Sequence, residues 1–330
     1  MMNLLPDLYE HWKGQVRGIW HRRLAVAAQA FRSVWSNKWV RHLSLAAWVL
    51  CLGQSAILFG VGQLLVKDSV IYTVVNQMDA QPRALVGGLV SWILERPDLS
   101  VSSTYGLCFY YFTRWFQPLS LVLVTLMIPT LISQDLSSRA IIIYRSKALG
   151  QGDYLFGKFM AVFGLLGFVW LLPIIQAWLL GCLLSPEWFF LWHARLALFQ
   201  SIGFVVASIT FLSLLAMGVS ALSQREKATT VIWLVLWILG HFLAKSQGED
   251  HPWLAYLSFT HILDQWAIQL FNPSAHVSQL MENLPILGSF TSLTERWMRF
   301  PTAEGAAPWV GAAVMVGMSA IILKRKVKPE

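Results

Sequence analysis

Six long apolar windows constrain this chain more than any other feature of its sequence. They run over the approximate ranges 43–66, 115–133, 159–184, 196–222, 229–244 and 307–323. A helix that crosses a bilayer needs about 20 mostly apolar residues, and the fifth window is the shortest. Of the 330 residues, 56% are hydrophobic and 13% are charged, whereas soluble domains carry about 25% charged residues. The sequence predicts an all-α integral membrane protein with six transmembrane helices in residues 42–330.

The segment before the first window, residues 1–41, has the pattern of a basic amphipathic helix. Apolar residues recur in it at steps of three and four positions, and the basic residues lie largely outside that stripe. A Trp- and Phe-rich face opposite Lys and Arg is typical of an interfacial helix, although a calmodulin-target-like segment shares the pattern. We therefore expect a cytoplasmic helix in the headgroup plane. The stripe consists of Trp12, Val16, Ile19, Trp20, Ala27, Phe31, Val34 and Trp35.

The distribution of basic residues predicts the orientation of the chain. With a cytoplasmic amino terminus, 17 of the 25 Lys and Arg residues fall on the cytoplasmic side. Because basic loops resist translocation, we expect both termini in the cytoplasm and the protein in a cell membrane, as in a bacterial inner membrane. The same bias accounts for the net charge of +8 without nucleic acid as a partner. The outer loops are then 67–114 and 245–306, and the second should form a re-entrant or interfacial helix between spans five and six.

The loop between the second and third windows, residues 134–158, carries the clearest functional signal. Asp135 or Ser133 can cap a short helix, and Gly150 and Gly152 can end it before the third span. Such a helix would be exposed at the inner membrane surface, where it could dock on a partner. Three basic residues favour that side: Arg139, Arg145 and Lys147.

This loop resembles the inner loop of permease subunits of type-2 ATP-binding-cassette (ABC) exporters. In that family a serine-x-acidic-leucine stretch ends the second span, and a tyrosine, a small or basic stretch and an aromatic-x-x-glycine-lysine follow before the third. Two positions depart from the pattern, since Ala148 stands where proline is common and Gln151 where arginine is common. The overall layout is also similar to the family: a basic interfacial helix, six spans, and a long outer loop between spans five and six. The matching residues are Ser133, Asp135, Leu136, Tyr144, Ser146, Lys147, Tyr154, Gly157 and Lys158.

The resemblance implies a permease subunit, with export as the direction, that is driven by a separate cytoplasmic ABC ATPase. The inner loop would dock in a groove of that ATPase, which would bind the ATP and Mg²⁺, so this chain would hold no cofactor and no catalytic residue. Two permease halves, identical or similar, would enclose the substrate path, and an outer-side accessory protein could join them. The residues implied in ATPase coupling are Asp135, Arg139, Tyr144, Arg145, Lys147, Tyr154 and Lys158.

Other chemical readings of the sequence are weaker. Residues 152–158 match the first seven positions of a phosphate-binding loop, but Phe159 replaces the hydroxyl residue that Mg²⁺ requires. His251, His261 and Asp264 have no second pair to complete a metal site, so we expect no metal. Amides in apolar windows should not face lipid, where they would lose hydrogen bonds. They could line a substrate path or join helices, and the candidates are Gln54, Gln176 and Gln200.

Two further functional classes compete with the permease. A membrane-embedded scaffold or assembly protein would bind partners through its outer loops and would tolerate mutation of the inner loop. A membrane-embedded enzyme would depend on acidic, His or Ser residues of the outer loops.

Overall fold

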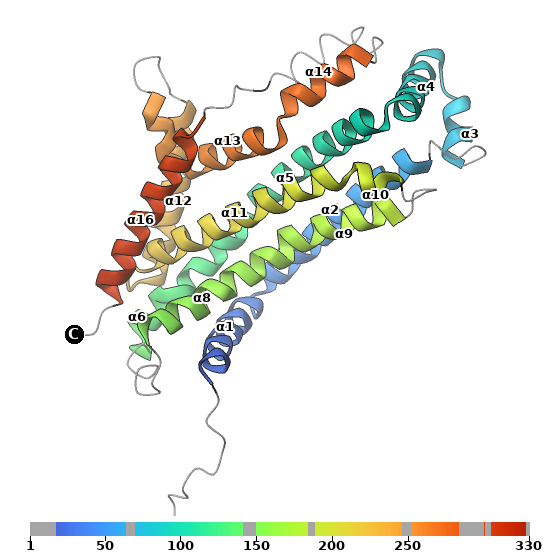
Figure 1. Ribbon diagram of the computed structural model, residues 1–330. Helices are drawn as coiled ribbons and strands as arrows, with labels where there is room; N and C mark the ends of the chain where they lie inside the picture. Colours follow the sequence, from blue (N-terminus) through green and yellow to red (C-terminus); the bar gives the residue numbers. More distant parts are fainter. Residues whose placement is uncertain are drawn as a thin grey trace, which may run out of the picture.

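A computed structural model describes residues 18–63, 70–140, 150–183, 189–245, 252–283, 300 and 305–327 (Figure 1). Within these residues every regular element is helical and none is a strand.

Among the described residues, six helical elements are long and apolar enough to cross a membrane. This confirms the prediction of an all-α chain with six candidate transmembrane helices. Two of the six contain a π-helical turn. In order they are α2 (Lys38–Gln63); α5 (Pro97–Ile128) with η2 (Pro129–Ser133) and α6 (Gln134–Ser137); α8 (Gln151–Leu166) with η3 (Gly167–Leu171) and α9 (Leu172–Leu183); α11 (Arg195–Ser220); α12 (Glu226–Lys245); and α16 (Ala307–Lys326).

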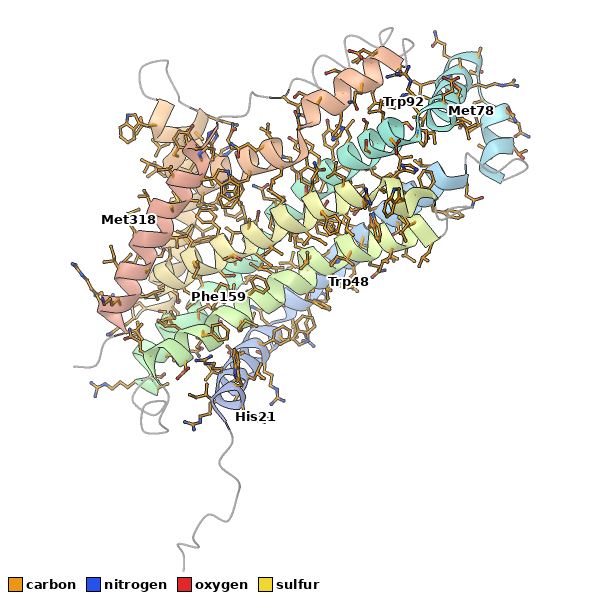
Figure 2. All side chains as sticks on the ribbon, viewed as in Figure 1. His21, Trp48, Met78, Trp92, Phe159 and Met318 are labelled. Carbon is orange, nitrogen blue, oxygen red and sulfur yellow. The ribbon has the colours of Figure 1, made fainter. Side chains whose placement is uncertain are left out.

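Shorter helices gather at the two ends of this bundle. At one end, α1 lies near α6, and at the other α3, α4 and α14 surround the start of α5 (Figure 1). Figure 2 places His21 at the first of these ends, which we term the α6 end, and Met78 and Trp92 at the second, the α4 end. The shorter helices are α1 (Ile19–Trp35), α3 (Val70–Asn76), α4 (Ala80–Glu95), α10 (Phe189–His193), the 3₁₀ helix η4 (Pro252–Leu257), α13 (Phe259–Phe271) and α14 (Pro273–Asn283).

The helix of the second span begins much earlier than its apolar window. Pro97 occupies the first turn of α5, a position that suits proline because the first amide groups of a helix have no partner within it. The helix then continues to Ile128 with Pro118 inside it. The predicted outer loop 67–114 therefore contains α3, α4 and the first half of α5.

Prolines accompany both π-helical turns of the bundle. Pro129 opens η2 and Pro173 follows η3 closely, and proline both lacks an amide hydrogen and crowds the preceding turn. In η2, the amides of Ile132 and Ser133 donate to Oγ of Ser220 at 2.9 and 3.1 Å. The Ser220 hydroxyl in turn donates to a carbonyl of α5 at 2.7 Å. A side chain of α11 thus satisfies the backbone groups of the turn.

The two central helices of the bundle are α5 and α11. Their most apolar stretches are 61% and 67% buried, against 17% for α12 and 28% for α16. Close approaches fix the other spans around them. A Cβ at Gly181 of α9 would lie 2.9 Å from Leu58 of α2, and a Cβ at Gly218 of α11 would lie 2.5 Å from Ser319 of α16. These small residues let the helix backbones pack closely.

The described part of the connection between the fifth and sixth spans contains three short helices, η4, α13 and α14. α13 and α14 have 13 and 11 residues, too few to cross a bilayer. α13 ends at Asn272, which has left-handed backbone angles, and Pro273 then opens α14. Buried Phe259, Trp266 and other apolar residues pack α13 on the spans. Whether this pair is re-entrant or interfacial stays a prediction.

Candidate functional site

The predicted inner loop begins and ends at one buried cluster of polar side chains. Nζ of Lys158 lies 2.6 Å from Oδ2 of Asp135, and only 5% and 12% of the two side chains are exposed. The hydroxyl of Tyr154 donates to the same Oδ2 at 2.6 Å. Asp135 comes from α6 and the other two from the start of α8. We term these three residues the loop clamp, because they join the two ends of the loop 134–158 to each other.

The local sequence explains how the clamp residues meet. Tyr154 and Lys158 are four residues apart, so they share one face of α8. The backbone of Gly150 is extended and α8 begins at the next residue, so Tyr154 lies in the first turn of the helix. On the other side, η2 and its contact with Ser220 hold the short helix that carries Asp135. The clamp therefore depends on three spans rather than on the loop itself.

The amphipathic helix α1 is attached to the same part of α8. Nη2 of Arg23 lies 2.6 Å from Oδ1 of Asp153, and the Arg23 guanidinium also stacks over the rings of Trp20 and Phe156 at 4.8 and 5.3 Å. A Cβ at Gly157 would lie 2.8 Å from the side chain of Val26 on α1. α1 and the loop clamp are therefore connected through the first two turns of α8.

A polar cavity of about 270 Å³ lies between α1 and the loop clamp. Asp135 and Lys158 form part of its wall. The cavity is large enough for several water molecules, so the ion pair has access to hydration on one side. Its other lining residues are Val26, Gln29, Ala30, Ser33, Thr130, Gln134 and Ser138.

The structure corrects the expected helix cap and places only some of the predicted coupling residues. Ser133 makes no capping hydrogen bond, and Asp135 lies inside α6 with its carboxylate turned to the loop clamp. Arg139 is exposed and has a φ of 55°, which ends α6 in a left-handed conformation that costs a non-glycine residue about 1 kcal/mol. Tyr144, Arg145 and Lys147 lie outside the described residues.

The three glutamines of the predicted path differ in their surroundings. Gln54 on α2 is fully buried, and neither of its amide atoms has a hydrogen-bond partner among the described residues. Gln176 on α9 and Gln200 on α11 are half-buried. Gln54 lies one turn from Cys51, whose Sγ donates to the carbonyl of Pro173 at 3.0 Å. Gln54 therefore faces the interface of α2 and α9.

An ion pair between α5 and α13 was not predicted from the sequence. Nη2 of Arg114 on α5 lies 2.9 Å from Oδ1 of Asp264 on α13. The same oxygen accepts a bond from Gln117 at 3.4 Å, and Arg114 also donates to the hydroxyl of Tyr110 at 2.9 Å. Burial raises the pKa of the Asp264 carboxyl, and the guanidinium opposes that change. The signal available in the sequence was the charge of Arg114 and the amide of Gln117 at the start of an apolar window. Their common partner, Asp264, is 147 residues away from Gln117.

No protein-family model and no curated protein matches this chain.

Proposed function

We propose that this protein is the permease subunit of an ABC transporter, coupled to a separate cytoplasmic ATPase through residues 134–158. The observation that supports this best is the loop clamp. A loop that only connects two spans needs no buried ion pair at its root, because burying two charges costs free energy that an apolar pair would not. A loop that receives force from a partner needs both of its ends fixed to the helices that must move.

In this proposal the chain transmits movement and performs no chemistry. The ATPase subunit would bind and hydrolyse ATP, and Arg139, Tyr144, Arg145 and Lys147 would contact it. A displacement of the loop would reach the second and third spans together, since Asp135 lies on α6 and Lys158 on α8. Arg23 would carry the same displacement to α1 through Asp153.

The burial of Tyr154, Lys158 and Gln54 changes the roles that we propose for them. Tyr154 and Lys158 are 3% and 4% exposed, so in this proposal they hold the loop ends instead of touching the ATPase. Gln54 is the strongest of the three candidates for a polar contact along the path, because a buried amide without partners needs hydrogen bonds. The proposed protein would work as a pair of permease halves in a cell membrane, with both termini in the cytoplasm.

Co-purification from membranes tests the proposal. We expect the wild-type chain to bring down an ATPase subunit in a fixed ratio, and a variant with Tyr144, Arg145 and Lys147 changed to Ala to lose it. The matched control changes three exposed basic residues in the last turn of α16 to Ala, and it should keep the ATPase. These residues are Lys324, Arg325 and Lys326.

The competing functions predict different results. If no ATPase accompanies the wild-type chain, the permease proposal is wrong and the scaffold becomes the better account. If the loop variant and the control lose the ATPase equally, binding depends on general basic charge and the docking role of the loop is wrong.

A further inference from the structure

The junction of α1 and α2 presents a basic and aromatic surface that the proposed function does not use. Only Ser36 and Asn37 separate the two helices. Around them the side chains of four basic residues are exposed, and Trp39 is 69% exposed. We term this surface the elbow patch, and it consists of Arg32, Lys38, Trp39, Arg41 and His42.

The elbow patch has no compensating negative charge nearby in the sequence. From His11 to Lys67 the chain contains no Asp or Glu. Within the part of the chain that the structure describes, the ion pairs are formed by other residues, and Arg32, Lys38 and Arg41 take part in none of them. The patch is therefore a site of uncompensated positive charge.

The apolar surface next to the patch indicates what kind of partner it fits. Lys38, Arg41, Leu45, Val49 and Leu52 follow one another at steps of three and four residues, so they share one face of α2. The last three are 64%, 60% and 58% exposed. Positive charge in the first turn thus continues directly into an exposed apolar stripe on a helix that can span a membrane.

The fixed position of α1 keeps the elbow in place. Trp35 packs against Phe168 with ring centroids 5.8 Å apart, and Trp48 of α2 packs against the same ring at 5.5 Å. Both helices of the elbow therefore rest on one side chain of the third span. Arg32 and Arg41 are held at the same end of α2 instead of moving on a free terminal segment.

We propose that the elbow patch and the adjoining face of α2 bind anionic phospholipids of the surrounding leaflet. Arg32, Lys38 and Arg41 would contact the phosphate and anionic headgroup, the indole of Trp39 would lie in the headgroup layer, and the exposed stripe of α2 would contact the acyl chains. Each Lys or Arg near an anionic membrane surface strengthens binding by about fivefold. This proposal does not depend on the permease function, because it requires only that α2 spans the membrane.

Native mass spectrometry of the full chain tests the proposal, with phosphatidylglycerol and phosphatidylcholine of identical acyl chains supplied as competitors. We expect wild type to retain phosphatidylglycerol at least fivefold better than phosphatidylcholine. Changing Arg32, Lys38 and Arg41 to Gln should bring that ratio close to one. The matched control, Lys324, Arg325 and Lys326 changed to Gln, removes equal charge from the last turn of α16 and should leave the ratio unchanged.

Several results of this experiment would overturn the proposal. An unchanged ratio in the elbow variant, or an equal fall in both variants, would overturn the proposal, as would a wild-type ratio near one. If wild type retains a second protein copy over this face in place of lipid, the proposal is also wrong. Should the elbow variant fail to fold, wild type at low and high salt gives the test, because the preference of exposed charges should fall as screening increases.

Discussion

Removing one partner of the Asp135–Lys158 pair should destabilise the protein at least as much as removing both, so the two single losses should not add. Asp135→Asn keeps the shape of the side chain and its bond to Tyr154, but it leaves the Lys158 ammonium buried without a counter-charge. Lys158→Met leaves the carboxylate in the same position. Breaking a buried pair in this way costs about 3–5 kcal/mol. The adjoining cavity of about 270 Å³ gives the remaining charge access to water, so we place each single change near the lower value, about 3 kcal/mol.

The double variant Asp135→Asn/Lys158→Met has no unpaired charge. We expect it to lose about 3 kcal/mol or less in total, because replacing a whole buried pair is often nearly neutral. The coupling energy between the two sites is then at least about 3 kcal/mol. Unfolding of the purified chain by SDS in mixed micelles, followed by circular dichroism, measures all four free energies.

Additivity would refute this reasoning. If the loss in the double variant equals the sum of the two single losses within about 0.5 kcal/mol, the two charges do not stabilise one another. The distance of 2.6 Å between them would then have no energetic consequence, and the loop ends would not be clamped by this pair.

Three further predictions concern other contacts. Ser220→Ala removes the partner of two buried amides and should cost about 2–4 kcal/mol, whereas Ser213→Ala, whose hydroxyl bonds only within its own helix, should cost much less in the same SDS assay. Gly157→Ala should lower the thermal midpoint by forcing α1 away from α8, and Gly164→Ala on the same helix, where a Cβ meets nothing within 4 Å, should not. Burial lowers the pKa of His276, so the stability it contributes is present above the unfolded-state value of about 6.5 and falls as the pH drops below it. The difference in thermal midpoint between wild type and His276→Gln should change between pH 7 and pH 5, and a constant difference would contradict this.

The spans could be predicted from the sequence because their signal is local. Each apolar window reports burial in lipid or in the bundle without knowledge of any distant residue. The early start of α5 at Pro97 was missed for the same reason, since residues 97–114 are helical by packing against α4 and α14 and are less uniformly apolar. Local patterns identify apolar length better than helix length.

The loop clamp could be predicted only in part. The motif resemblance selected Asp135, Tyr154 and Lys158, but assigned them to a partner protein or to a cap, and no local pattern shows that the three meet one another. The bonds that Ser220 accepts from the η2 amides and the pairing of Arg114 with Asp264 join residues on helices far apart in the chain. Such contacts follow from the packing of helices, which a single sequence does not specify.

The π-helical turn η2 also determines the rotational phase of everything that follows it in the second span. Each residue of an α-helix turns the next side chain by about 100°, and a π turn accommodates one residue more than an α turn does. If residues 129–133 wound as an α-helix at the same length, the rest of the span would turn by about 100° and would carry Asp135 with it. Its carboxylate would then point away from α8, although every residue of the loop clamp would still be present. The π-helical winding of this turn therefore matters as much as the identity of the charges that it orients.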